Sequence, residues 1–122
     1  MKETTTIIVP VDFSKSTESL VEYAVYMAEK LSAVTHFVHV LDFMRFVDYY
    51  TGEAMLGVPY VQECEEQLLT NAKEKMSKLI KDNKEKCLGC SGEVVTGDPV
   101  DKIIEIARGK DSELIIISTH GA

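Results

Sequence analysis

Two polar residues follow directly on apolar runs, at positions where a strand would end and a ligand could be held. Asp12 follows the first run and Ser118 follows the last. The Ser118 hydroxyl can donate a hydrogen bond to an anion, and Gly121 has no side chain to keep an anion from the backbone. His120 can titrate near neutral pH, but a single histidine in a turn is more often a hydrogen-bonding surface residue. We therefore predict a binding site without a catalytic residue, and Asp12 has the simpler alternative of capping the turn after it.

The spacing of the cysteine and histidine residues does not predict a metal site within one chain. Cys87 and Cys90 have the Cys-x-x-Cys spacing of redox dithiols and of half a zinc site. The pair lies after a predicted helix, away from the helix start that would lower a thiol pKa. His36 and His39 are three residues apart in a predicted strand, so they face opposite sides of it. We predict an ordinary loop carrying two thiols, with a metal shared between two chains as the alternative.

The elements that must position these residues follow from an alternation of apolar runs with stretches of helical period. This pattern is typical of parallel strands joined by crossover helices, so the predicted fold class is α/β, an open parallel sheet with helices on both faces. Continuous apolar runs indicate strands buried on both faces, and Pro10, which has no amide hydrogen, is placed near the carboxyl end of the first. The predicted strands cover residues 7–11, 36–41, 93–96 and 114–117.

Three helices are predicted between these strands. Ser14 or Ser16 caps the first, which continues to Leu31, and the second runs from about residue 59 to about residue 84. The third follows a turn at Gly97 and ends near residue 109. Its expected N-cap is Asp98, its first residue is Pro99, and its inward side chains are expected to be Val100, Ile103, Ile104 and Ala107. Residues 43–58 are predicted to be an irregular, apolar connection that covers a crevice or a partner, or packs on the adjacent helix.

Length and charge exclude several classes of protein. A chain of 122 residues has room for one domain, and 13 basic against 20 acidic residues give a net charge of −7. This charge repels polyanions, so we expect no nucleic-acid partner. No apolar run reaches the roughly 18 residues that cross a bilayer, so we expect no membrane partner and a cytoplasmic location. Three cysteines are consistent with a reducing compartment.

The last predicted strand, residues 114–117, is followed by only five residues. Nothing in the sequence then covers its outer edge, which would expose backbone groups and apolar surface. We expect self-association to cover this edge, through a homodimer or an exchanged segment. The alternative is that the chain is shortened from a longer natural product.

Four segments resemble the universal stress protein family: IIVPVDFSKS, HFVHVLD, VVTGDPVDKIIEIA and ELIIISTHGA, in this order over essentially the whole chain. The resemblance implies one such domain over residues 1–122 with strand order 3-2-1-4-5, of which the fifth strand is missing here. Many members of the family bind ATP and others do not. Open parallel sheets bind ligands where the strand order reverses, here between the first and fourth strands.

The resemblance implies an adenine nucleotide at this place. Asp12 would orient the ligand, and the backbone of Val40 would bond adenine. The predicted nucleotide-binding residues are Pro10, Val11, Asp12, Val40, Ile117, Ser118, His120 and Gly121. ATP-binding members carry Gly-x-x-Gly, nine residues, then Gly-Ser or Gly-Thr; here Ser118 replaces the first glycine and the distal pair is absent. The resemblance therefore implies weakened or absent ATP binding.

The sequence is compatible with three classes of function. The first is a nucleotide-binding or sensing module in a stress response, and the alternative is a nucleotide-free dimeric interaction protein. An enzyme is the least supported, because the motifs GxxxxGK[ST], GxGxxG and GxSxG are absent from the sequence, although weak ATP hydrolysis stays open.

Overall fold

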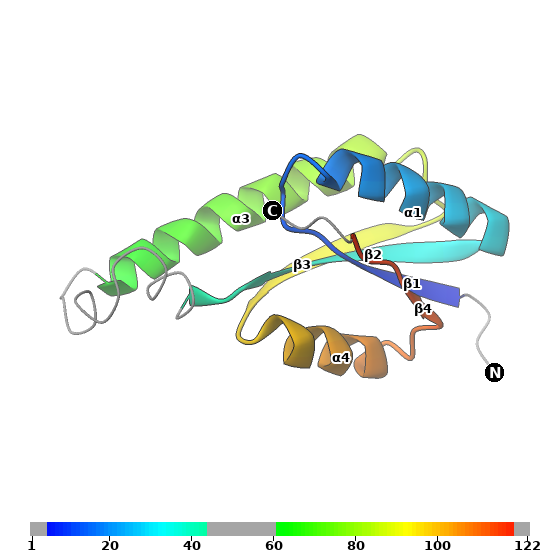
Figure 1. Cartoon of the computed structure of the whole chain (residues 1–122). Helices are drawn as coiled ribbons and strands as arrows, with labels where there is room; N and C mark the ends of the chain where they lie inside the picture. The colour runs from blue at the N-terminus through cyan, green and yellow to red at the C-terminus, as the bar shows by residue number, and fades with distance from the viewer. Residues whose placement is uncertain (1–4, 44–60, 119–122) are drawn as a thin grey trace.

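The computed structural model describes residues 5–43 and 61–118, and it shows four parallel strands in one sheet. The strand order is β3-β2-β1-β4, with α1 and α3 on one face of the sheet and α4 on the other (Figure 1). The elements are β1 (Thr5–Pro10), α1 (Thr17–Leu31), β2 (Ala33–Leu41), α3 (Val61–Asn83), β3 (Cys90–Thr96), α4 (Pro99–Gly109) and β4 (Leu114–Ile115). The predicted α/β class and strand order are confirmed. The apolar connection predicted over residues 43–58 lies, except for Phe43, outside the described residues.

The core lies mainly between the sheet and the pair α1 and α3. Ile7, Ile8 and Val9 of the central strand β1 have no exposed surface, as predicted for a strand covered on both faces. Phe37 of β2 is the largest fully buried side chain. Met76 of α3 joins the same cluster, which ties this long helix to the sheet.

Strands β2 and β3 begin earlier than the sequence pattern indicates. Ser32 adopts a left-handed conformation (φ 52°) directly after α1, so the chain turns into β2 at Ala33 without a loop. Strand β3 begins at Cys90, so the prediction that Cys90 belongs to a loop is wrong. Polar residues open β3 because it pairs with β2 alone among the described strands, and an edge strand is not covered enough to need a continuous apolar run.

Strand β4 differs from its prediction in length and burial. It covers two residues instead of four, and Ile115 and Ile117 are 39% and 65% exposed while Ile116 is buried. The prediction of burial on both faces is therefore wrong. Within the described residues, β4 pairs only with β1, so its other edge has no neighbouring strand (Figure 1).

Pro10 explains why the pairing of β1 with β4 ends early. Ile8 accepts a hydrogen bond from the Ile116 amide (2.9 Å), while the Val11 amide donates to Val38 (2.8 Å). Since backbone groups alternate between the two neighbouring strands, the backbone of Pro10 faces β4. Proline has no N–H, so the next backbone hydrogen bond from β1 toward the segment after β4 has no donor. The two strands are therefore free to diverge.

Helix α4 begins as its sequence predicts. The Asp98 carboxylate accepts a hydrogen bond from the Asp101 amide (3.0 Å), and Pro99 occupies the first turn. Gly97 has φ +137°, a backbone conformation that favours glycine.

The inward face of α4 agrees with its prediction at Ile103 and Ala107 and differs from it at the other two positions. Val100 and Ile104, predicted to be buried, are 64% and 42% exposed. Ile103, Ile106 and Ala107 are the partly buried apolar residues, and they follow the i, i+3, i+4 spacing of one helix face. Several apolar residues allow two overlapping stripes, and the sequence alone does not select between them.

Replacement of Asp98 by alanine is expected to lower the free energy of unfolding by about 1 kcal/mol, because the Asp101 amide loses its acceptor. Urea unfolding measures this loss. Asp98→Asn keeps a side-chain oxygen and should retain most of the stability. Equal stability of the alanine variant and the unchanged protein would contradict the cap.

Candidate functional site

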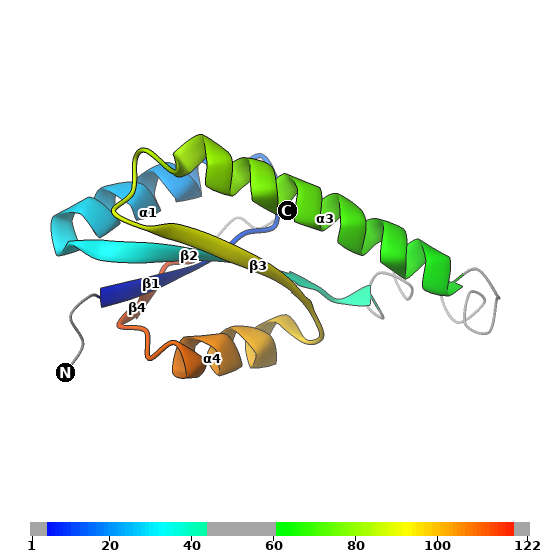
Figure 2. The ribbon, with the colours of Figure 1, turned by 180° about the vertical axis from the view of Figure 1, so that it is seen from behind.

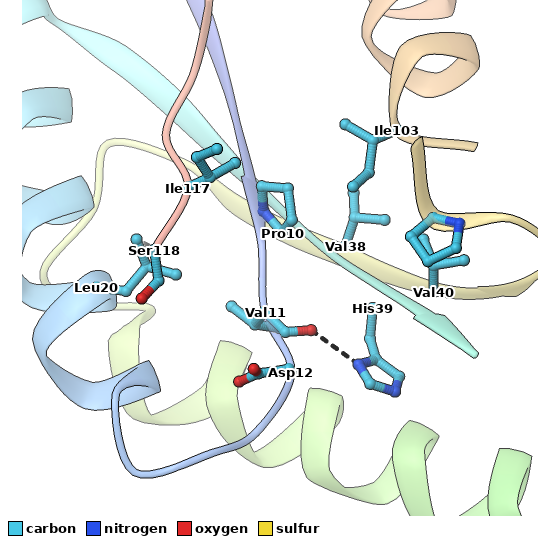
Figure 3. A pocket seen from close by; sticks show the side chains of 11 residues that line it. Pro10, Val11, Asp12, Leu20, Val38, His39, Val40, Ile103, Ile117 and Ser118 are labelled. Atoms are coloured by element: carbon cyan, nitrogen blue, oxygen red, sulfur yellow. Dashed lines mark hydrogen bonds between the residues drawn. The ribbon is translucent and has the colours of Figure 1, made fainter. Parts of the chain in front are cut away.

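A cavity of about 240 Å³ lies where the carboxyl ends of β1 and β2 meet the segment after β4 and the start of α4 (Figure 3). Strand β1 has β2 on one side and β4 on the other, so this is the place where the strand order reverses. Ligands of open parallel sheets bind at such places. The cavity is lined by Pro10, Val11, Asp12, Leu20, Val38, His39, Val40, Pro99, Ile103, Ile117 and Ser118.

Six of the eight residues predicted for the site line this one cavity: Pro10, Val11, Asp12, Val40, Ile117 and Ser118. Asp12 and Ser118, from two different strand ends, thus share one rim. His120 and Gly121 lie outside the described residues. The nucleotide-binding role of all eight remains a prediction.

Five lining residues were not predicted: Leu20, Val38, His39, Pro99 and Ile103. Val38 and His39 precede Val40 at the carboxyl end of the second strand. Their place at this strand end could have predicted that they line the cavity. Ile103 reaches the cavity from α4 and points toward Val38 (Figure 3). Its contribution depends on how α4 packs on the sheet, which the sequence pattern does not determine.

Asp12 shapes the loop that leads from β1 into α1. Its Oδ1 atom accepts hydrogen bonds from the Ser14 amide (2.9 Å) and from the Thr17 hydroxyl (3.3 Å). Ser16 occupies the N-cap position of α1 without a side-chain capping bond, so the serine cap predicted for this helix is wrong. Asp12 therefore caps the turn after β1, which is the simpler of its two predicted roles. It also lies exposed on the rim of the cavity.

His39 fixes the same loop from the side of β2. Its Nδ1 atom lies 2.8 Å from the Val11 carbonyl oxygen, and because a carbonyl can only accept, Nδ1 carries the hydrogen (Figure 3). The imidazole packs against the ring of Phe13 with centroids 4.8 Å apart, and Lys75 of α3 lies over the same ring at 5.9 Å. The backbone of Phe13 has φ 59°, a conformation that residues other than glycine seldom adopt.

The chemistry of the cavity favours binding of a largely apolar group that makes a few polar contacts. Most of its lining side chains are valine, leucine, isoleucine or proline, while Asp12, His39 and Ser118 supply polar atoms. A few polar groups in an apolar pocket are typical of small-molecule sites. In the part of the chain that the structure describes, no three His, Cys, Asp or Glu side chains are grouped closely enough to hold a metal ion.

The two thiols of the Cys-x-x-Cys segment lie apart from this cavity. Burial is the main cause that raises the pKa of Cys90 to about 12, and the neighbouring Cys87 raises it further. The Cys90 thiol is therefore protonated at neutral pH and is a weak nucleophile.

An open parallel sheet with helices on both faces and a cavity at its switch point is typical of the doubly wound class of α/β domains. Within this class the chain belongs to the universal stress protein family, whose family model matches residues 3–122.

Solved structures of the family have the same fold. The chain is similar to the universal stress protein UspA from Lactobacillus plantarum, with 22% identity and a TM-score of 0.77 over 100% of this chain and 81% of the other. It is also similar to the universal stress protein from Archaeoglobus fulgidus in complex with dAMP, with 20% identity and a TM-score of 0.63 over 95% and 82% of the two chains. Within residues 5–43 and 61–118, no helix is both long enough and apolar enough to cross a membrane.

Proposed function

We propose that this protein is a nucleotide-binding or sensing module of the stress response and that its cavity takes an adenine nucleotide, with ATP as the first candidate. The observation that carries the proposal is the meeting of Asp12, Val40 and Ser118 around one apolar cavity at the switch point of the sheet. The Archaeoglobus fulgidus relative in complex with dAMP supports this choice of ligand class.

The size of the cavity suggests which part of the nucleotide it would hold. Its volume of about 240 Å³ is below the roughly 300–1,000 Å³ of sites that enclose drug-sized ligands. We expect the base and ribose to occupy it, with the adenine between Val40 and the apolar side chain of Ile103, and with Ile117 on the side where the phosphates leave the cavity. The phosphates would then extend past Ser118, where one hydroxyl replaces a glycine of the family motif. Most of the affinity should come from the nucleoside end.

Two measurements on the full chain test the proposal. Purified protein is denatured and the supernatant is analysed for released adenine nucleotide, and the nucleotide-free protein is titrated calorimetrically with adenosine, ATP and GTP. We expect saturable binding of adenosine and ATP with similar affinities, and weaker binding of GTP. Absence of binding for both adenosine and ATP, together with no released nucleotide, would overturn the proposal.

The open side of β4 favours a second candidate, a dimeric interaction protein. Ile104 of α4 and Ile115 of β4 line one shallow hollow and are both exposed, and Ile117 is more exposed still. Apolar groups gathered at an open strand edge are typical of interaction surfaces. We propose that a second copy of the chain covers them in a cytoplasmic homodimer. Sizing at several concentrations tests this, and a stable monomer at high concentration would contradict it.

A further inference from the structure

Strands β2 and β3 bring three polar side chains together outside the cavity. His36 and Ser91 are direct partners in the β2–β3 register, and Glu93 lies two residues further along the same face. His36 is only 5% exposed. Its Nδ1 atom lies 2.7 Å from the Ser91 hydroxyl oxygen and its Nε2 atom lies 2.5 Å from the Glu93 carboxylate.

The partners determine which ring nitrogen carries the hydrogen. The Glu93 carboxylate can only accept, so Nε2 donates to it. In the neutral ring, Nδ1 is then the acceptor and the Ser91 hydroxyl donates to it. This is the proton order of a serine, histidine and acid triad, with the two ring nitrogens exchanged, and a triad is identified by geometry and roles.

The surroundings of His36 keep it in the neutral, accepting form. Burial is the largest cause that lowers the pKa of His36 below its ordinary value of 6.5, and the charge of Lys110 lowers it further. The hydrogen bond to Glu93 and its charge act in the opposite direction without reversing the shift. At neutral pH the imidazole is a free base beside the hydroxyl.

Ser91 can be reached from solution. It is exposed on β3, which pairs only with β2 among the described strands (Figure 2). The Gly89 carbonyl and the Gly97 amide both bond to β2, so the odd-numbered residues of β3 face β2 and the Gly92 N–H faces the outer edge. The amide that follows the nucleophile is one that α/β-hydrolases use to bind a developing oxyanion.

We propose that Ser91 is a nucleophile that accepts acyl groups from activated esters, with His36 as its general base and Glu93 as a positioning residue. The Ser91 oxygen bonds to the acyl carbon while its proton passes to His36 Nδ1. The bond from that carbon to the leaving oxygen then breaks, and the leaving group takes the proton from His36. The products are a Ser91 ester and an alcohol or phenol, and no other reagent is required.

The reaction should be slow and should need an activated ester. Ser91 lies in contact with water, where a few donors stabilise an oxyanion much less than they do in an enclosed site. General-base assistance still contributes roughly 10²–10⁴-fold. We therefore expect acylation of Ser91 and not rapid turnover.

The test exposes the full chain to para-nitrophenyl acetate and locates acetyl groups by peptide mass spectrometry. Acetylation of Ser91 is expected, and Ser91→Ala should remove it together with the matching release of nitrophenolate. Ser77→Ala is the control, because Ser77 is exposed on α3 in a different element. Acetylation confined to lysine side chains, or equal loss in the two variants, would overturn the proposal.

The roles of His36 and Glu93 are tested by the pH profile, which needs no change in the buried histidine. In the unchanged protein, the rate of Ser91 acetylation should reach a plateau at pH values above the His36 pKa and decrease at lower pH, with the midpoint under pH 6.5.

Glu93→Gln removes the charge that favours the imidazolium, so the rate should fall at least about tenfold and the midpoint should move to lower pH. Glu93→Asp should restore part of the rate. A rate that rises with hydroxide concentration alone, or an unchanged midpoint in Glu93→Gln, would show that His36 is not the base. The proposal is independent of nucleotide binding.

Discussion

Replacement of Ile117 by aspartate is expected to weaken ATP binding by at least about tenfold without unfolding the protein. Ile117 lines the cavity beside Ser118, on the side where the phosphates of the proposed nucleotide would leave it. Its side chain is 65% exposed, so the fold should accept a charged group there. Two unit charges about 8 Å apart repel by about 2 kcal/mol at an effective dielectric constant near 20, and about 1.4 kcal/mol corresponds to a factor of ten.

Adenosine gives this prediction its internal control. Because adenosine has no phosphate, Ile117→Asp should lower the affinity for adenosine much less than the affinity for ATP. Val100→Asp is the matched variant, because Val100 is an apolar residue of α4 with almost the same exposure, 64%, and does not line the cavity. Calorimetric titration at low salt measures both variants, and added salt should reduce the difference, since it screens exposed charges. Equal losses in the two variants, or equal losses for adenosine and ATP, would contradict the proposed position of the phosphates.

Much of the fold could be predicted from the sequence because each strand contains part or all of an apolar run. Residues 7–11 are apolar without interruption because β1 is central and covered on both faces. The start of α4 could also be predicted, since Gly97, Asp98 and Pro99 each have a specific local role. The starts of β2 and β3 could not be predicted, and in edge strand β3 the reason is that its first residues are polar or small.

The candidate site could be predicted only in part. Residues at strand ends, such as Asp12 and Ser118, could be placed near one another, because parallel strands finish at the same edge of a sheet. Ile103 could not be placed there, because the sequence predicts that it lies on the inward face of α4 but does not predict which part of the sheet that helix covers. The spacing of His36 and His39 excludes a shared metal but predicts no role for His39, which the structure shows bonded to the Val11 carbonyl and lining the cavity.

The contact of His36 with Ser91 and Glu93 illustrates what a sequence pattern cannot supply. These residues are 55 and 57 positions from His36. They meet because β3 pairs with β2 in one register, and a shift of one residue would turn Ser91 and Glu93 to the opposite face. The missed early start of β3 at Cys90 left Ser91 outside the predicted strand, and its pairing with His36 could not be expected.

Replacement of Phe37 by alanine is expected to lower the free energy of unfolding by about 3–5 kcal/mol, which is the usual cost of removing a buried phenylalanine. Phe37 is fully buried and belongs to the cluster between the sheet and α1 and α3. Small domains have total stabilities of about 5–15 kcal/mol, so the loss should bring urea unfolding to much lower concentrations. Tyr23→Ala, at a side chain of α1 that is 55% exposed, should change stability by less than about 0.5 kcal/mol.

The same variant separates the stability of the sheet from the shape of the cavity. Neighbouring strand residues face opposite sides, so Phe37 points to the α1 and α3 layer while Val38 lines the cavity with Ile103. While Phe37→Ala remains folded, its affinity for adenosine should therefore stay within about threefold of the unchanged protein, corresponding to about 0.7 kcal/mol. A large loss of affinity in folded Phe37→Ala would show that the cavity depends on the opposite layer, because removal of one ring there would then alter the carboxyl ends of β1 and β2. A loss of stability no greater than that of Tyr23→Ala would instead show that Phe37 does not anchor the core.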